Sequence, residues 1–126
     1  MRQGRFSKLS KIMILLLWIG MPQSIFAFVQ KDIETKKIEY LLREVENLSG
    51  GKFWRNGSSY SPKQAADHLR MKWGKAGSSV KTVKDFIEKV GSKSSMSGKA
   101  YEIEFADGKK VNTSVFFYER LATWRP

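Results

Sequence analysis

The sequence predicts a small α+β domain in which three or four short helices pack with a small antiparallel β-hairpin. In several segments, apolar residues recur every three or four positions, as expected for helices with one buried face. Further along, Tyr101, Ile103 and Phe105 instead alternate with acids, which is typical of a strand with one buried face. Asp107-Gly108 follows directly and is a common tight turn between two strands.

The first helix is expected to begin at Asp32, whose side chain can cap it, and to run to about Ser49. Gly50-Gly51 then ends it, because glycine readily adopts the backbone conformation that closes a helix. Its apolar residues form a stripe that a core can bury, while lysine, arginine and glutamate fill the other positions. The stripe consists of Ile38, Leu41, Leu42, Val45 and Leu48.

A short β-prone segment at residues 52–55 and a turn at residues 56–59 come next. The second helix has a strong start signal at Ser61-Pro62. The serine can cap the helix, proline suits the first helical position, and Gln64 can return a hydrogen bond to the cap. We therefore expect a helix from Pro62 onward.

The second helix frays at residues 74–77, where two glycines lie. Thr82 followed by Asp85 repeats the start signal and predicts a third helix of about two turns that stops at Gly91. Residues 92–99 are small and polar and indicate a loop. The hairpin follows, with residues 109–112 as its returning arm. A closing helix then starts at Thr113 or Ser114 and uses Phe117, Leu121 and Trp124.

The N-terminal segment has the features of a cleavable signal peptide spanning residues 1–27. A basic start without acids precedes the apolar run of residues 12–21, and Ala27 offers a small residue at the cut. A membrane anchor is disfavoured because spanning takes ~20 apolar residues, and Pro22 interrupts this run. We expect a single mature domain at residues 28–126, periplasmic or secreted, with no transmembrane anchor after cleavage.

Composition restricts the chemistry of the expected mature chain. It keeps 19 basic and 12 acidic residues, a net charge of about +7, which favours an anionic partner such as an envelope polymer. An envelope protein is the other partner considered. Basic residues beside tryptophans, as in Trp54-Arg55, could contact nucleic acid, but their positions suit the core and make nucleic acid an unfavoured partner.

The chain has no cysteine and one histidine, His68. Thiolate catalysis, thiolate metal sites and imidazole-rich metal sites are therefore excluded, and no metal or cofactor is expected. A catalytic base would have to be His68, yet no Gly-x-Ser-x-Gly nucleophile motif accompanies it. A structural role for His68 is favoured, and we expect no catalytic residues and no enzyme activity.

Three motifs are similar to those of a small exported bacterial family, domain of unknown function 5329. They read F-x-R-N-G from Phe53, A-x-x-H-L-x-x-K from Ala65 and S-S-x-S-G-x-x-Y from Ser94. The resemblance covers about residues 33–121 and implies export and a shared fold, but it gives no residue a chemical role. The polar residues it singles out are Arg55, Asn56, His68, Lys72, Ser94, Ser95, Ser97 and Tyr101.

Two interpretations of these eight residues stay open. They could build an anion- or peptide-sized pocket, or they could tie turns and helix ends together, which is the ordinary use of such side chains.

Three classes of function are considered. The first is a non-enzymatic binding or structural module with a basic surface. The second is an inhibitor that acts through the 94–101 loop, because Ser97–Tyr101 resembles the Ser-Gly-x-x-Tyr loop of bacterial periplasmic lysozyme inhibitors. The third and least favoured is a hydrolase that uses His68 with a loop serine.

Overall fold

The computed structural model describes residues 20–126, and the compact domain within it comprises Lys31–Pro126. The basic start and nearly all of the apolar run of the expected signal peptide lie outside the described residues. Among the helices that are described, none combines the length and the apolar character needed to cross a membrane.

Helix α2 spans Gln23–Glu46, so the predicted start at Asp32 and the predicted end at Ser49 are both wrong. Asp32 does not cap the helix; it lies inside it and forms an ion pair with Lys36, 3.0 Å away and one turn further on. The segment after Pro22 contains no glycine or proline, so nothing in it stops the helix from starting earlier.

The strands form one antiparallel sheet in the order β2-β1-β3-β4 within the described chain. Their bounds are Lys52–Arg55 for β1, Ser58–Tyr60 for β2, Glu102–Glu104 for β3 and Lys110–Asn112 for β4. The expected hairpin is β3–β4. A second hairpin, β1–β2, joins it because Phe53 of β1 pairs with Ile103 of β3. The α+β class is therefore confirmed, with a sheet larger than one hairpin.

The turn expected at residues 56–59 is only two residues long. Asn56 and Gly57 both have positive φ, 49° and 79°, and the chain enters β2 at Ser58. Successive residues with positive φ match the right-handed twist of the paired strands, and Asn-Gly is the dipeptide that best tolerates them. This tight turn places Arg55 and Tyr60 on neighbouring strands.

The remaining helices begin where their caps predict. α3 (Pro62–Ala76) and α4 (Val83–Phe86) each start with a complete capping box, at Ser61 and Thr82 respectively. A 3₁₀ turn, η1 (Gly77–Ser79), follows α3, and a π-helical turn, η2 (Ile87–Gly91), continues α4 to the expected stop at Gly91. α5 (Thr113–Thr123) closes the chain.

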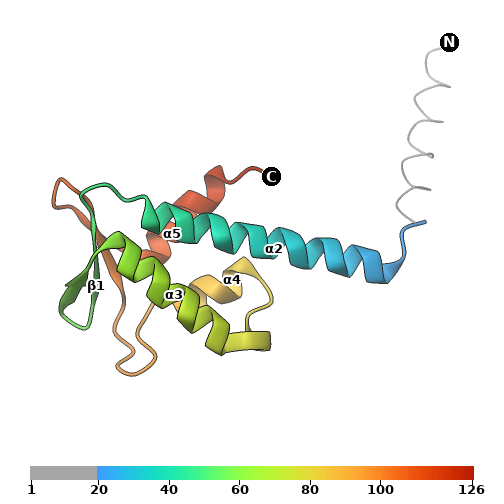
Figure 1. Ribbon diagram of the computed structural model, residues 1–126, viewed down its shortest axis with the longest axis horizontal. Coiled ribbons are helices and arrows are strands. Elements are labelled where there is room, and N and C mark those ends of the chain that lie inside the picture. Colours follow the sequence, from blue (N-terminus) through green and yellow to red (C-terminus); the bar gives the residue numbers. More distant parts are fainter. Residues whose placement is uncertain (1–19) are drawn as a thin grey trace, which may run out of the picture. The chain divides into compact units, whose positions relative to one another are not determined.

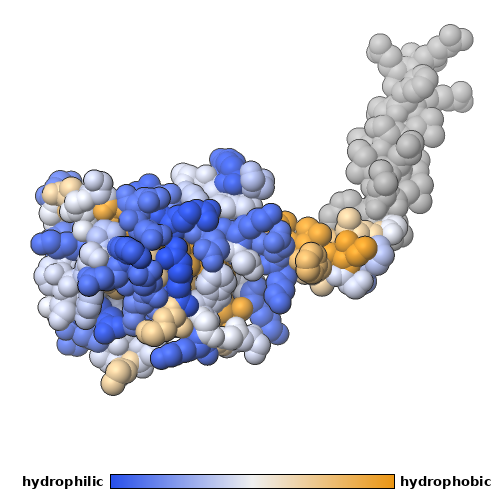
Figure 2. All heavy atoms as spheres, in the orientation of Figure 1, coloured by the Kyte–Doolittle hydropathy of each residue, from blue (hydrophilic) through white to orange (hydrophobic). Residues whose placement is uncertain are grey.

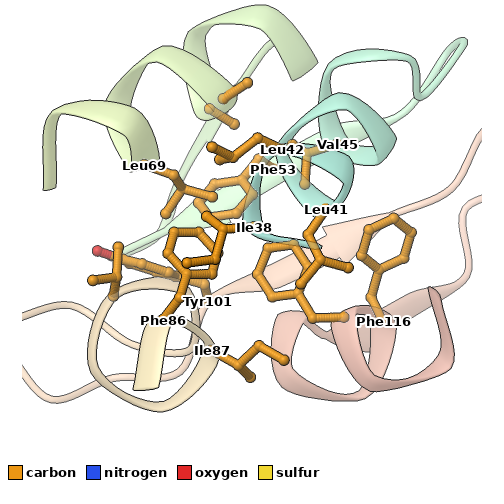
Figure 3. Close-up of a cluster of buried hydrophobic side chains, with 14 of the residues drawn as sticks. Ile38, Leu41, Leu42, Val45, Phe53, Leu69, Phe86, Ile87, Tyr101 and Phe116 are labelled. Atoms are coloured by element: carbon orange, nitrogen blue, oxygen red, sulfur yellow. The ribbon is translucent and has the colours of Figure 1, made fainter. Parts of the chain in front are cut away.

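The core lies between the helices and one face of the sheet. The strands gather on the side of β1, and α3, α4 and α5 lie on the other side (Figure 1). Phe53 and Ile103 face the helices and are fully or almost fully buried. Figure 3 shows Phe53 packed among side chains of α2, α3, α4 and α5, and Ile103 belongs to the same core cluster. The face of the domain seen in Figure 2 is mostly hydrophilic, as a core confined to the interior requires.

Candidate functional site

Arg55 and His68, which lie thirteen positions apart in the sequence, are in direct contact. Arg55 is the last residue of β1, and its Nη1 lies 2.8 Å from Nε2 and 3.2 Å from Nδ1 of His68 on α3. A guanidinium can only donate hydrogen bonds, so a neutral imidazole is the acceptor. The guanidinium carbon also lies 5.3 Å from the centre of the Tyr60 ring on β2. Arg55 is thus held by a histidine and a tyrosine.

Lys72, one helical turn after His68, ties three parts of the chain together. Its Nζ donates to the carbonyl oxygens of Val90 and Lys93, at 2.9 and 3.0 Å, and to the Tyr101 hydroxyl at 3.0 Å. The Tyr101 ring belongs to the core cluster, and its hydroxyl reaches the edge of that cluster (Figure 3). All three ammonium donors therefore have acceptors, and the contacts of Lys72 are structural.

Asn56 joins the tip of the β1–β2 hairpin to the serine loop of residues 92–101. Its Nδ2 donates to Ser94 Oγ at 3.2 Å, and its Oδ1 accepts from Ser97 Oγ at 2.6 Å. Within the loop, Ser97 N donates to Ser94 Oγ, and Gly98 N donates to Ser94 O. These bonds fit the interpretation that polar side chains secure turns.

Ser95 is the candidate that the structure leaves apart from these contacts. It lies exposed at the tip of the serine loop, beside Met96, whose side chain is 98% exposed. The eight candidates therefore form an Arg55–His68 pair, a Lys72–Tyr101 pair and an Asn56–Ser94–Ser97 network, with Ser95 outside them. The ring of His68 meets that of Tyr101 edge-on, with 6.5 Å between centres, which links the two pairs.

A pocket of about 260 Å³ opens beside Arg55 and His68. Four further residues line it, which sequence reasoning did not select: Phe53, Tyr60, Gln64 and Ala65. Gln64, Ala65 and His68 share one side of α3 because His68 follows Ala65 by three positions and Gln64 by four, spacings that place side chains on the same helix face. The contact between Arg55 of β1 and this helix depends on tertiary packing, which no local pattern in the sequence records.

The pocket is electropositive. Burial lowers the pKa of His68 below its usual value of 6.5, and the charges of Arg55, Lys72 and Lys75 lower it further. Burial, followed by the charge of Arg55, also lowers the pKa of Lys72. Within residues 20–126, no carboxylate pairs with Arg55 or Lys72. The site therefore carries positive charge that the described protein does not neutralise.

Metal binding finds no support in the described part of the chain, which contains no group of three or more histidine, cysteine or acidic residues placed to hold an ion. This geometry suits the binding of an anion: the guanidinium of Arg55 is held in place, and part of the pocket lining below it, which we call the apolar floor, is apolar. Fold and site together define a small α+β domain with a cationic, ligand-sized pocket next to a hydrogen-bonded serine loop.

The chain belongs to the family of unknown function DUF5329, whose sequence model matches residues 32–125. This confirms the resemblance that the three motifs indicated. The chain is also 35% identical over 68 residues to the uncharacterized protein YfeK of Salmonella typhimurium. That match covers 54% of this chain and 57% of the relative, so the chain spans little more than half of the relative's length. No solved structure shows significant similarity to the chain.

Proposed function

We propose that this protein is an exported, non-enzymatic binding module that holds an anionic partner in the bacterial envelope. The observation that carries the proposal is the unneutralised positive charge of Arg55 at the wall of a 260 Å³ pocket. A partly buried cation without a counter-ion is unfavourable, and an anionic partner would relieve this. The surplus of basic residues in the expected mature chain would assist the encounter through long-range attraction.

Lys72 and Arg55 contribute to the proposed binding in different ways. The ammonium of Lys72 is fully occupied by protein acceptors, so it contributes to the positive potential but not to direct binding. The guanidinium of Arg55 keeps donors to spare, because the ring of His68 is its only hydrogen-bond partner among the described residues, where the buried Nε also has no partner. Arg55 is therefore the residue that would contact the partner.

The test is retention of the envelope partner on the immobilised mature protein. We expect anionic material from an envelope extract to bind the parent, to be released by salt, and to be lost from an Arg55→Gln variant. Arg43→Gln is the matched control, since it removes the same charge from an exposed side chain of α2 that forms no ion pair in the described chain. Equal retention by both variants would contradict the proposal.

Export rests on the basic start and apolar run of residues 1–27. Family membership is compatible with it, and the location we propose is the periplasm or the extracellular space.

The non-enzymatic part of the proposal draws support from the environment of His68. A hydrolase based on His68 and a loop serine would need the imidazole to accept a proton from the serine hydroxyl. In residues 20–126, the hydrogen-bond partner of His68 is instead Arg55, which has no proton to give up at neutral pH.

A second candidate function is inhibition of a lysozyme-like enzyme through residues 94–101. Backbone hydrogen bonds from Ser94 N to Lys99 O and from Tyr101 N to Ser92 O close this loop, and Met96 projects from it fully exposed. A rigid loop loses little entropy on entering an enzyme cleft. The measurement is lysozyme activity with added parent protein or Met96→Asp. Inhibition by the parent alone supports this candidate, and no inhibition by either eliminates it.

A further inference from the structure

Resting on the binding function proposed above, we infer that the pocket of Arg55 takes the terminal carboxylate of a peptide chain that ends in a small apolar residue. The guanidinium of Arg55 binds the carboxylate, and the apolar floor holds the side chain next to it. Four features of the structure support this assignment: the fixed position of Arg55, the charge of the pocket, its lining, and its size.

The guanidinium of Arg55 is already positioned to bind a planar anion. Its guanidinium is fixed by a 2.8 Å contact with His68 and by the Tyr60 ring, so a ligand need not immobilise it. A planar guanidinium matches the two oxygens of a carboxylate with two parallel hydrogen bonds. No acid lines the pocket and none pairs with Arg55 in the described chain, so the ligand meets no competing carboxylate.

The charge of the pocket favours a monoanion. One guanidinium with free donors faces the site, while the Lys72 ammonium is already satisfied by three acceptors. His68 is neutral at pH 7, because burial and neighbouring cations lower its pKa. A dianionic phosphate would bring a second negative charge, and the residues that line the pocket include no second cation to pair it, whereas a carboxylate brings one.

The other lining residues suit a chain end. Phe53, Ala65 and the ring of Tyr60 offer apolar surface for a small side chain. Gln64 also lines the pocket; its side-chain oxygen accepts from Ser61 N, and its side-chain nitrogen has no acceptor among the described residues. That nitrogen can donate to the last peptide carbonyl of a ligand.

The volume of the pocket limits the ligand. At about 260 Å³ it is slightly smaller than typical sites for drug-sized molecules, which start at about 300 Å³. It therefore admits the end of a polymer and leaves the rest of the chain outside. Capture of a C-terminal carboxylate is a known mode of peptide recognition, and here a fixed arginine would supply it.

The experiment uses the single histidine as the probe. With an untagged protein, nuclear magnetic resonance of the ring protons follows His68 without ambiguity, because the sequence has no other histidine. The ligands are N-acetyl-alanyl-alanine, its C-terminal amide, sodium acetate and inorganic phosphate. We expect the acid to bind, the amide to bind about tenfold more weakly or not at all, and the pKa of His68 to rise when the acid binds, since a nearby anion favours the imidazolium.

Substitutions at Arg55 and Arg43 distinguish specific binding of the carboxylate by Arg55 from attraction by the positive charge of the whole protein. Arg55→Gln should weaken binding of the acid by about tenfold or more, Arg55→Lys should restore it only in part, and Arg43→Gln should leave it unchanged. The comparison of the acid with its amide uses the parent protein. It therefore tests recognition of the carboxylate even if an Arg55 variant unfolds. Acetate should bind more weakly than the dipeptide, because it cannot fill the apolar floor.

Several results would overturn the inference. Equal binding of acid and amide would exclude carboxylate recognition, and tighter binding of phosphate than of the dipeptide would make the pocket a phosphate site. If no ligand binds but envelope retention still requires Arg55, the inference fails and the proposed function stands. If retention is also independent of Arg55, both fail.

Discussion

Gly91 marks the closest approach of η2 to α5. A Cβ at this position would lie 2.6 Å from Cε2 of Phe117, inside the buried core. The Gly91 carbonyl also accepts a 2.6 Å hydrogen bond from Thr113 Oγ1, which holds the two segments together. We predict that Gly91→Ala lowers the free energy of unfolding by about 1–3 kcal/mol through overpacking, measured by chemical denaturation.

Gly74 provides the matched control for this substitution. It lies in α3, and a Cβ there would meet nothing within 4 Å. Gly74→Ala should therefore stabilise the protein by about 0.5–1 kcal/mol, because alanine loses less backbone entropy in a helix. If Gly91→Ala were as stable as the parent, the packing between η2 and α5 would be looser than described.

The lowered pKa of His68 in the folded protein predicts that stability depends on pH. Its pKa is lowered on folding, chiefly by burial and then by Arg55, Lys72 and Lys75, whereas in the unfolded chain it is near 6.5. Between the two pKa values the unfolded chain binds more protons. The free energy of unfolding must therefore fall as the pH drops from about 7 through the pKa of folded His68. The stability that depends on a neutral His68 is fully present above about pH 7.

The measurement compares the parent with His68→Gln by denaturation at a series of pH values from 7.5 to 5. Other groups contribute to both proteins, so the difference between them isolates His68. We expect the difference in unfolding free energy to change with pH over this interval. A constant difference would show that the histidine titrates alike in both states.

At the scale of elements, the contact between the β1–β2 hairpin and the serine loop rests on Asn56. Asn56→Gly keeps the positive φ that the turn requires and removes the bonds to Ser94 and Ser97. We predict a loss of about 0.5–1.5 kcal/mol per bond and faster hydrogen exchange in residues 92–100. Combining it with Ser97→Ala should cost less than the sum of the two changes, because both remove the same bond. Additive costs would show that the two residues do not interact.

Another contact between elements shows what local patterns miss. Glu34 of α2 is buried, and its Oε2 accepts a 2.7 Å hydrogen bond from Val83 N, the first residue of α4. The Thr82–Asp85 capping box could be predicted because all its atoms come from four consecutive residues. Glu34 lies 49 positions away, and although it is one turn before Ile38 on the apolar stripe, a glutamate is ordinarily expected to be exposed.

At the scale of the whole molecule, we predict that the exported form begins at Phe28. The described residues before it, and those up to Asp32, are exposed. Removing residues 1–27 should therefore leave the melting temperature of the domain unchanged, because the described part of that segment, residues 20–27, contributes no side chain to the core. N-terminal sequencing of the secreted protein and thermal unfolding of both forms check this. Recovery of Met1 on a membrane-embedded product would contradict it.

Part of the candidate site could be predicted from the sequence. The motifs selected Arg55, His68 and Lys72, and the structure places all three around one cationic region. Tyr60 and Gln64 were missed because each fits a purely local role: Tyr60 follows a turn, and Gln64 completes a capping box. Their second role appears only in the tertiary structure, where both residues line the same pocket.

The sequence by itself determined the α+β class, the starts of α3 and α4, the β3–β4 hairpin and the family. Each of these depends on interactions within a few residues, or on periodicity, which a linear pattern records. The tertiary structure alone decided the pairing of β1 with β3, the lining of the pocket and the partner of His68. These depend on which buried faces meet across long stretches of chain, and many pairings satisfy the same pattern until packing selects one.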